Sequence, residues 1–265
     1  MSRTNYVLSN KLWNKVPEIT VIFWVIKILA TTVGETAGDL LSTRLGLGLT
    51  ITSWVMTGLC LVALIWQVRS KRYYPTPYWL EVVLISVVGT LISDLLVDGL
   101  GISLVYTTLA FSGLLTVVFA AWFVSERTLS IHTIFTTRRE LFYWAAILAT
   151  FALGTSAGDL AAETLNLGYG PSALIFAQLI GLVAALHFVF KFDAILCFWV
   201  AYILTRPLGA SVGDFLAKPH LAGGMGWGTI NTSIVFLSLI AALVLFLTTT
   251  RIDRTEIVVP AADAA

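Results

Sequence analysis

Charged residues are scarce in this sequence: they make up 12% of its 265 residues, against a hydrophobic share of 58%. A soluble domain carries roughly a quarter charged residues, so the composition excludes an ordinary soluble globular protein. The net charge of +1 argues against nucleic acid or another polyanion as a partner. With three histidines and two cysteines, Cys60 and Cys197, both within apolar stretches, neither a disulfide framework nor a His/Cys metal cluster can be assembled. The sequence therefore predicts a membrane protein with the lipid bilayer as a partner.

Eight apolar stretches are long enough to cross a bilayer, which takes about 20 residues each. They are residues 20–43, 48–67, 79–98, 102–124, 141–162, 171–190, 194–216 and 227–249. No small-residue cleavage site follows the first stretch, so we expect an anchor rather than a removable signal peptide. Twelve basic residues lie at the two ends of the chain and in every second loop, and only Arg44 and Lys218 lie on the other side. The positive-inside rule then predicts that both termini are cytoplasmic.

The predicted spans contain a fourfold repeat of tryptophan, glycine and aspartate at constant spacing. Its copies are Trp24–Gly34–Asp39, Trp79–Gly89–Asp94, Trp144–Gly154–Asp159 and Trp199–Gly209–Asp214. The tryptophans lie 55, 65 and 55 residues apart, which indicates a duplication of an already duplicated unit. Each unit holds two spans, so every copy enters the membrane in the same direction. The sequence thus predicts an all-α polytopic bundle of eight transmembrane helices, built from four parallel two-helix repeats around a pseudo-symmetry axis along the membrane normal.

The longest polar connection, residues 125–140, divides the predicted bundle into two halves. The first half, 20–124, holds repeats 1 and 2, and the second, 141–250, holds repeats 3 and 4. We expect the connection to be a cytoplasmic linker and residues 1–19 to be a cytoplasmic N-terminal segment. The end of the chain, 251–265, is polar and then rich in alanine, which predicts a flexible tail.

Each motif helix presents one face of polar and small residues, which must point into the protein because polar groups facing lipid would be unsatisfied. Small residues recur on this face at a spacing of four, which lets two helix backbones approach closely in a bilayer. The pairs are Gly34/Gly38, Gly89/Ser93, Gly154/Gly158 and Gly209/Gly213. We interpret these pairs, together with the tryptophans Trp24, Trp79, Trp144 and Trp199, as helix-packing residues.

The aspartates are the candidate functional residues, because charge within a membrane span is costly and packing alone does not require one acid in every repeat. Glu35 precedes Asp39 by one helical turn, and like charges at this spacing repel unless a cation or proton neutralises them. The predicted substrate or ion site consists of Asp39, Asp94, Asp159, Asp214 and Glu35. A hard cation bound by oxygen atoms fits this inventory better than zinc or copper, and no cofactor is predicted.

Two basic residues, Lys27 and Arg206, lie within predicted spans and break the fourfold symmetry. The favoured interpretation is charge compensation, in which Arg206 pairs with a carboxylate of a neighbouring repeat. The alternative is that these residues act as a gate or internal counter-ion, which leaves the acids when a substrate cation or proton arrives.

Three copies of the motif carry a resemblance to a known family. They are Gly-Glu-Thr-Ala-Gly-Asp (34–39), Gly-Thr-Ser-Ala-Gly-Asp (154–159) and Gly-Ala-Ser-Val-Gly-Asp (209–214). With one tryptophan per two-helix unit, the chain resembles bacterial integral membrane proteins built from four tandem copies of a repeat of unknown function, often called uncharacterised membrane-anchored proteins. The resemblance runs from Trp24 to about residue 249 and implies a bacterial inner (plasma) membrane. Repeat two departs from it at Ser93-Asp94, and the family implies no activity.

Three functions compete for this pattern. The sequence favours a non-enzymatic, cation- or proton-linked transporter that uses membrane-embedded aspartates, as acidic rings do in cation pathways. A structural or accessory membrane protein, with the aspartates as interhelical hydrogen-bond glue, is close behind. An intramembrane aspartyl protease needs two distinct acids sharing a proton, whereas one motif recurs four times here, so this function is the remotest. The sequence leaves open a homo-oligomer and whether the four aspartates meet.

Overall fold

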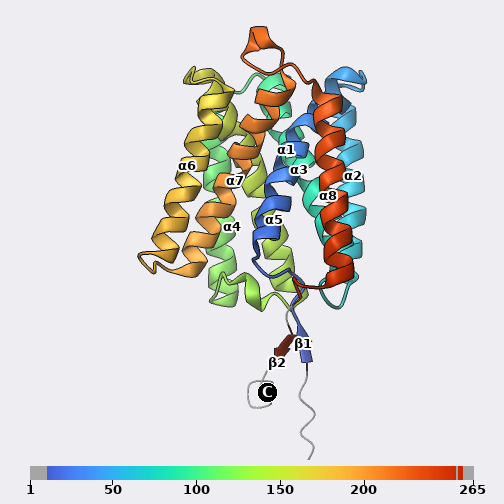
Figure 1. Cartoon of the computed structure of the whole chain (residues 1–265), viewed down its shortest axis with the longest axis vertical. Helices are drawn as coiled ribbons and strands as arrows, with labels where there is room; N and C mark the ends of the chain where they lie inside the picture. Colours follow the sequence, from blue (N-terminus) through green and yellow to red (C-terminus); the bar gives the residue numbers. More distant parts are fainter. Residues whose placement is uncertain (1–10, 255, 259–265) are drawn as a thin grey trace, which may run out of the picture.

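A computed structural model describes residues 11–254 and 256–258 of the chain as a bundle of long helices (Figure 1). The helices are α1 (Val21–Asp39), α2 (Gly48–Arg69), α3 (Pro75–Asp94), α4 (Leu104–Glu126), α5 (Thr137–Asp159), α6 (Tyr169–Phe188), α7 (Ala194–Ala217) and α8 (Thr229–Thr250). All eight are long and apolar enough to cross a membrane. The structure therefore confirms the predicted all-α, eight-span fold of four two-helix repeats.

Local sequence explains where the helices begin. The side chains of Thr20, Thr136 and Asp193 accept hydrogen bonds from backbone N–H groups in the first turns of α1, α5 and α7. Such caps satisfy donors that have no partner within the helix. α3 starts at Pro75, because a proline fits the first turn, where its missing N–H is not needed. With these signals, α3 begins at Pro75 rather than at the predicted residue 79, and α5 begins at Thr137 rather than at 141. The non-helical connection between α4 and α5 is therefore shorter than the predicted linker.

Three motif helices continue past their aspartate into a π-helical turn. These turns are η1 (Leu40–Arg44), η2 (Leu95–Gly99) and η4 (Leu160–Thr164), and each begins directly after the motif aspartate. The fourth motif helix, α7, contains Pro207 and runs as an α-helix to Ala217. Since π-turns are rare and often lie at functional sites, the aspartate end of the bundle differs from an ordinary helix end. Repeat 4 is therefore the conformational exception.

The four motif helices form an inner ring. α1 contacts α3, α3 contacts α5, α5 contacts α7, and α7 contacts α1. Each outer helix packs against the motif helix of the following repeat: α2 on α3, α4 on α5, α6 on α7 and α8 on α1. At least 56% of the apolar window is buried in every inner helix and at most 22% in any outer helix. The repeats therefore interlock, and the two predicted halves close into one bundle.

The motif glycine of each repeat lies where an inner helix meets its neighbour. A Cβ atom on Gly89 would lie 2.7 Å from Cβ of Phe151 in α5. Gly34 faces Ser86 of α3 in the same way, and Gly154 and Gly209 face the equivalent residues of α7 and α1. The close approach of these backbones is what a helix-packing role requires.

The second small residue of each pair lies one turn further along the same contacts, where the fit is looser. A Cβ atom on Gly38 would lie 3.3 Å from a methyl carbon of Thr90 in α3, and one on Gly213 would lie 3.2 Å from Cβ of Glu35 in α1. Gly158 differs, because a Cβ atom there would lie 3.5 Å from that of Ala210 in α7, an ordinary van der Waals distance. All three glycines thus lie at helix contacts. The fit is tightest at the first glycine of each pair, and the contact at Gly158 leaves room for a methyl group.

Aromatic side chains of the four inner helices form a layer around the bundle axis, between the motif glycines and the end that carries the N-terminal segment. The aromatic residue that precedes each motif tryptophan contacts the tryptophan of a neighbouring repeat, with ring centroids 5.5–6.2 Å apart. The pairs are Phe23–Trp79, Tyr78–Trp144, Tyr143–Trp199 and Phe198–Trp24. Aromatic pairs at this separation attract one another in addition to burying area. The predicted packing tryptophans thus form a closed layer across the inner ring.

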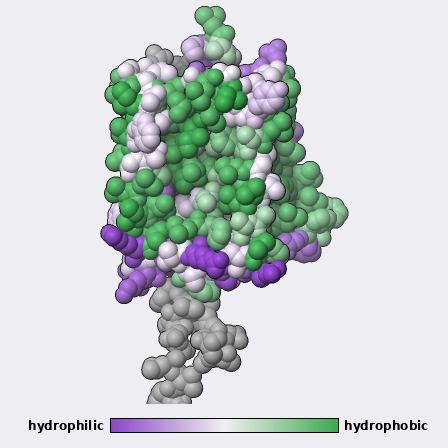
Figure 2. All heavy atoms as spheres, turned by 180° about the vertical axis from the view of Figure 1, so that it is seen from behind, coloured by the Kyte–Doolittle hydropathy of each residue, from purple (hydrophilic) through white to green (hydrophobic). Residues whose placement is uncertain are grey.

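The described chain begins and ends at the same end of the bundle, where β1 (Lys11–Trp13) pairs antiparallel with β2 (Glu256–Val258) (Figure 1). Residues 256–258 of the predicted flexible tail thus form a strand, while 1–10, 255 and 259–265 lie outside the described residues, including Arg3 of the predicted cytoplasmic segment. On the face seen in Figure 2, hydrophobic residues cover most of the length of the helices, and a band of hydrophilic residues lies at the end of the bundle nearest the strands. This surface is that of a membrane protein.

Candidate carboxyl cluster at one end of the inner ring

The motif aspartates gather at the end of the inner ring that lies opposite the two strands. Asp39, Asp94 and Asp159 are the last residues of α1, α3 and α5, and each is half-buried. Asp214, which lies within α7, is only 2% exposed. Glu35 lies one turn deeper on α1, is 5% exposed, and has a carboxylate oxygen within 4.8 Å of those of Asp159 and Asp214. The five side chains of the predicted ion site are therefore brought together, and we call them the carboxyl cluster.

Three members of the cluster come especially close to one another. Carboxylate oxygens of Glu35, Asp159 and Asp214 all lie within 4.8 Å of one another, from helices α1, α5 and α7. Asp39 and Asp94 lie outside this triad. The asymmetry arises because only repeat 1 carries a glutamate after the motif glycine; the other repeats have threonine or alanine there. The geometry suits a shared proton or a hard cation bound by carboxylate oxygens.

Arg206 of α7 is fully buried and lies on the inner side of the carboxyl cluster, about two turns before Asp214. Its Nη2 lies 3.0 Å from a carboxylate oxygen of Glu35, and its Nη1 donates to the backbone oxygen of Thr31 at 2.5 Å. The guanidinium also donates to the hydroxyls of Thr90 on α3 and Thr155 on α5. One side chain thus connects all four inner helices, through the fixed fork of donors that a guanidinium provides. Arg206 pairs with a carboxylate of a neighbouring repeat, as charge compensation requires.

Lys218 lies above the cluster, just after the last residue of α7. Its Nζ is 3.2 Å from an oxygen of Asp214 and 3.4 Å from one of Glu163, and it donates to the Tyr169 hydroxyl at 2.8 Å. Burial lowers the pKa of Lys218, but these negative and hydroxyl partners outweigh it and raise the pKa above the usual lysine value. The stabilisation from this charge is therefore present throughout neutral pH and is lost only well above it. The sequence identified Lys218 only as a loop charge.

Lys27, the other base within the spans, is separate from the cluster. It is fully buried on α1, and its Nζ lies 3.9 Å from the ring centre of Phe151 and 4.0 Å from that of Tyr202. Among the described residues, this nitrogen has no hydrogen-bond partner. Lys27 therefore compensates no carboxylate directly, and aromatic faces are its nearest partners.

Apart from the bonds of Arg206, hydroxyl groups rather than the aspartates make the side-chain hydrogen bonds between inner helices. Thr90 donates to the backbone oxygen of Gly34 at 3.1 Å, and Thr31 donates to that of Thr205 at 3.1 Å. Ser93 and Ser156 are hydrogen-bonded to each other at 2.8 Å, which explains what the serine of repeat two does where the other motifs have glycine. In the described part of the chain, no motif aspartate makes a side-chain hydrogen bond to another inner helix. The sequence analysis missed this role of the threonines, although threonine follows the motif glycine in two repeats.

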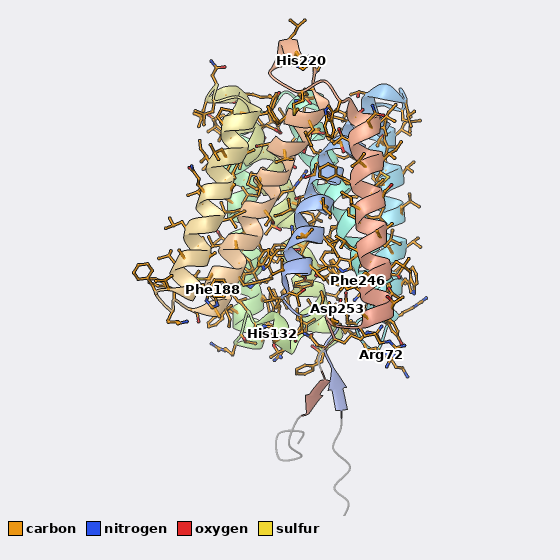
Figure 3. The ribbon with its side chains drawn as sticks, in the orientation of Figure 1. Arg72, His132, Phe188, His220, Phe246 and Asp253 are labelled. Atoms are coloured by element: carbon orange, nitrogen blue, oxygen red, sulfur yellow. The ribbon has the colours of Figure 1, made fainter. Side chains whose placement is uncertain are left out.

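A second buried ion pair closes the opposite end of the ring, beyond the aromatic layer. Lys15 of the N-terminal segment lies 2.7 Å from Glu140 of α5, which also accepts a hydrogen bond from Gln67 at 3.1 Å. Deeper in the bundle, the hydroxyls of Tyr78 and Tyr143 lie 2.5 Å apart. Figure 3 shows Arg72, His132 and Asp253 at this end and His220 at the opposite one. The sequence analysis assigned Lys15 and Glu140 only to polar flanking segments and did not predict their pairing.

All four repeats match one family model, described as a Repeat of Unknown Function (DUF347), over residues 22–73, 77–128, 142–192 and 197–253. The matched segments cover most of the chain and coincide with the four two-helix units. Comparison with curated proteins and with solved structures finds no match.

Proposed function

Because the chain belongs to this family of membrane proteins built from a repeat of unknown function, we propose a function from its residues: a cation- or proton-linked transporter that uses the carboxyl cluster. We further propose that it lies in the bacterial inner membrane with both termini cytoplasmic. The carboxyl cluster then lies at the outer end of the inner ring. No enzymatic step is part of this proposal.

The observation that carries the proposal is the charge imbalance of the cluster. Five carboxyl groups share one end of the inner ring, and the described bases in contact with them are Arg206 and Lys218. Ionised carboxylates at this depth are costly unless a positive charge or a proton accompanies them. A bound proton or hard cation among Glu35, Asp159 and Asp214 would supply the missing positive charge.

The two ends of the inner ring support a direction of access. The half-buried Asp39, Asp94 and Asp159 leave the cluster partly open at its own end. The other end is closed by the aromatic layer and by the Lys15–Glu140 ion pair. A proton or cation would therefore enter the cluster from the outer side and need rearrangement of the aromatic layer and the ion pair to leave on the cytoplasmic side.

A structural role remains the second candidate, because Arg206 is bonded to the three other inner helices and could serve stability alone. This alternative gives the aspartates the role of hydrogen bonds between helices. Threonine and serine side chains form such bonds between the inner helices instead, which argues against that role. A protease would depend on two acids only, and the triad supplies three.

The test compares two isosteric changes in proteoliposomes. Asp159→Asn removes one charge from the triad, whereas Asp98→Asn removes an exposed charge that lies one turn beyond Asp94 and outside the triad. We expect wild type to dissipate a proton or metal-ion gradient, Asp159→Asn to reduce the rate at least about 10-fold, and Asp98→Asn to retain it. A folded wild-type protein that moves no cation, or equal loss in both variants, would refute the transport proposal.

A further inference from the structure

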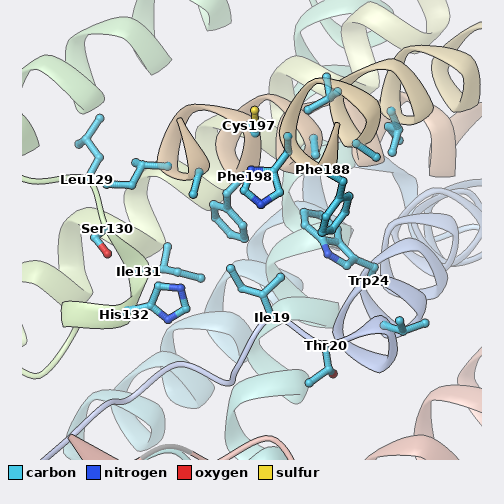
Figure 4. A pocket seen from close by; sticks show the side chains of 18 residues that line it. Ile19, Thr20, Trp24, Leu129, Ser130, Ile131, His132, Phe188, Cys197 and Phe198 are labelled. Atoms are coloured by element: carbon cyan, nitrogen blue, oxygen red, sulfur yellow. The ribbon is translucent and has the colours of Figure 1, made fainter. Parts of the chain in front are cut away.

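A groove of about 520 Å³ lies on the side of the bundle, toward the end that carries the strands. It runs between α1, α6 and α7 and is bounded below by the short helix η3 (Ile131–Thr133) of the linker. Figure 4 shows Ile19, Trp24 and Phe198 facing this space, with His132 at its edge. The volume is in the range of small-molecule binding sites, about 300–1,000 Å³.

Comparison with the preceding repeat shows which side chains are smaller at the groove. In the preceding repeat, Trp122 of α4 stacks on Phe142 of α5, with ring centroids 6.4 Å apart. At the same distances from their motif tryptophans, repeats 3 and 4 carry His187 on α6 and Cys197 on α7, and both line the groove. Two smaller side chains thus stand where the α4–α5 pair has two large rings, which leaves room for the groove.

The lining is divided by polarity along the groove. Toward the middle of the helices it is apolar, with Ile180, Val183 and Ala201 among its residues. Its polar lining residues all lie near the end of the bundle that carries the strands. They are Thr20, Ser130, His132 and His187. An apolar chain with a polar head at that end fits this division.

We propose that the groove binds one acyl chain of a phospholipid whose headgroup is acidic. The spans place the groove in a bilayer, where acyl chains are the available apolar ligand, and a chain there would restore contacts that the missing ring pair would have made. Lys191 lies in the turn between α6 and α7, whose flanking residues His187 and Ala194 line the groove. Basic pockets between helices at the cytoplasmic side are typical sites for acidic lipid headgroups.

The acidic side chains near the headgroup end have other partners. Asp193 caps α7 by accepting a hydrogen bond from the Leu196 N–H at 2.8 Å, and Glu18 lies 4.0 Å from His132. These contacts hold the two carboxylates without neutralising them, and Lys191 supplies a positive charge in the turn between α6 and α7. This inference is independent of the proposed transport, because it concerns the outer face of α6 and α7 rather than the carboxyl cluster.

The test restores the ring pair of the preceding repeat. The double variant His187→Trp with Cys197→Phe fills the groove, and Leu182→Trp adds the same bulk at an exposed position of α6 outside it. Each protein is purified in mild detergent with equal amounts of phosphatidylglycerol and phosphatidylethanolamine, and bound lipid is counted by native mass spectrometry. A second variant, Ala184→Phe, fills the groove from another lining position of α6 and covers the case in which the double variant does not fold.

We expect wild type and Leu182→Trp to retain one phospholipid, with phosphatidylglycerol favoured about 5-fold, and the filled variants to lose it. A wild-type protein without retained phospholipid, or equal retention in wild type and the filled variants, would overturn the groove as a lipid site. Equal retention of the two lipids would overturn the acidic headgroup.

Discussion

At the scale of single residues, the two bases within the spans, Lys27 and Arg206, have different environments. In the sequence both are only basic residues in apolar segments. Arg206 has a carboxylate, two threonine hydroxyls and two backbone oxygens within hydrogen-bonding distance. Lys27 has two aromatic faces and, among the described residues, no hydrogen-bond partner. The sequence predicts two basic residues in spans but not this difference, because it depends on which residues of α3 and α5 face them.

Arg206→Met should destabilise the protein strongly, because it leaves Glu35 buried without its counter-ion. Removing one partner of a buried ion pair costs about 3–5 kcal/mol. Thermal unfolding in detergent measures the effect. Arg206→Lys is the matched control: it keeps the charge but not the fork of donors, so an intermediate loss is expected. Equal unfolding temperatures for wild type and Arg206→Met would contradict a stabilising role of this pair.

Lys27→Met should leave the unfolding temperature unchanged or raise it. Methionine is similar in length, and a hydrophobic replacement of a buried polar group that has no partner removes a desolvation cost of about 1–3 kcal/mol. The same thermal unfolding assay measures the result. A large decrease would mean that Lys27 has an anionic partner and would restore the compensation interpretation for this residue.

At the scale of helices, the spans and their number follow from hydropathy, whereas the pairing of helices does not. Each outer helix packs on the motif helix of the following repeat, and short loops alone allow packing within the same repeat equally well. The π-helical turns after Asp39, Asp94 and Asp159 are not predicted either, because the spacing of apolar residues there is that of an α-helix. The motif glycines, in contrast, mark the inner contacts that the sequence pattern indicates. Their spacing does not reveal that Gly158 is packed more loosely than Gly38 and Gly213, because this depends on the residue of the neighbouring helix.

Gly89→Leu should separate α3 from α5, because even a Cβ atom there would lie 2.7 Å from Phe151. Overpacking of this kind typically costs about 1–3 kcal/mol, and here it also disturbs the ring closure. Gly113→Leu on the outer helix α4 is the matched control, since nothing lies within 4 Å of a Cβ atom at that position. We expect a lower unfolding temperature for Gly89→Leu only; equal effects of the two changes would contradict the packing role.

At the scale of the whole molecule, four similar repeats produce one asymmetric site. Glu35 and Arg206 each occur in a single repeat, so they convert a fourfold arrangement of aspartates into a triad on α1, α5 and α7. The sequence identified all five acids of the cluster, because buried charge is conspicuous in apolar spans. It did not show that they meet, because parallel repeats fix a common depth but not the side of each helix that faces the axis.

The central claim is that the carboxyl cluster is one site shared by the repeats rather than four separate ones. Equilibrium binding of the transported cation, or potentiometric proton uptake if the transported species is a proton, measures this directly on purified protein. The account predicts one binding event per chain, which Asp159→Asn and Asp214→Asn each abolish and Asp98→Asn preserves. Four equivalent events per chain, or one that survives both triad substitutions, would contradict it.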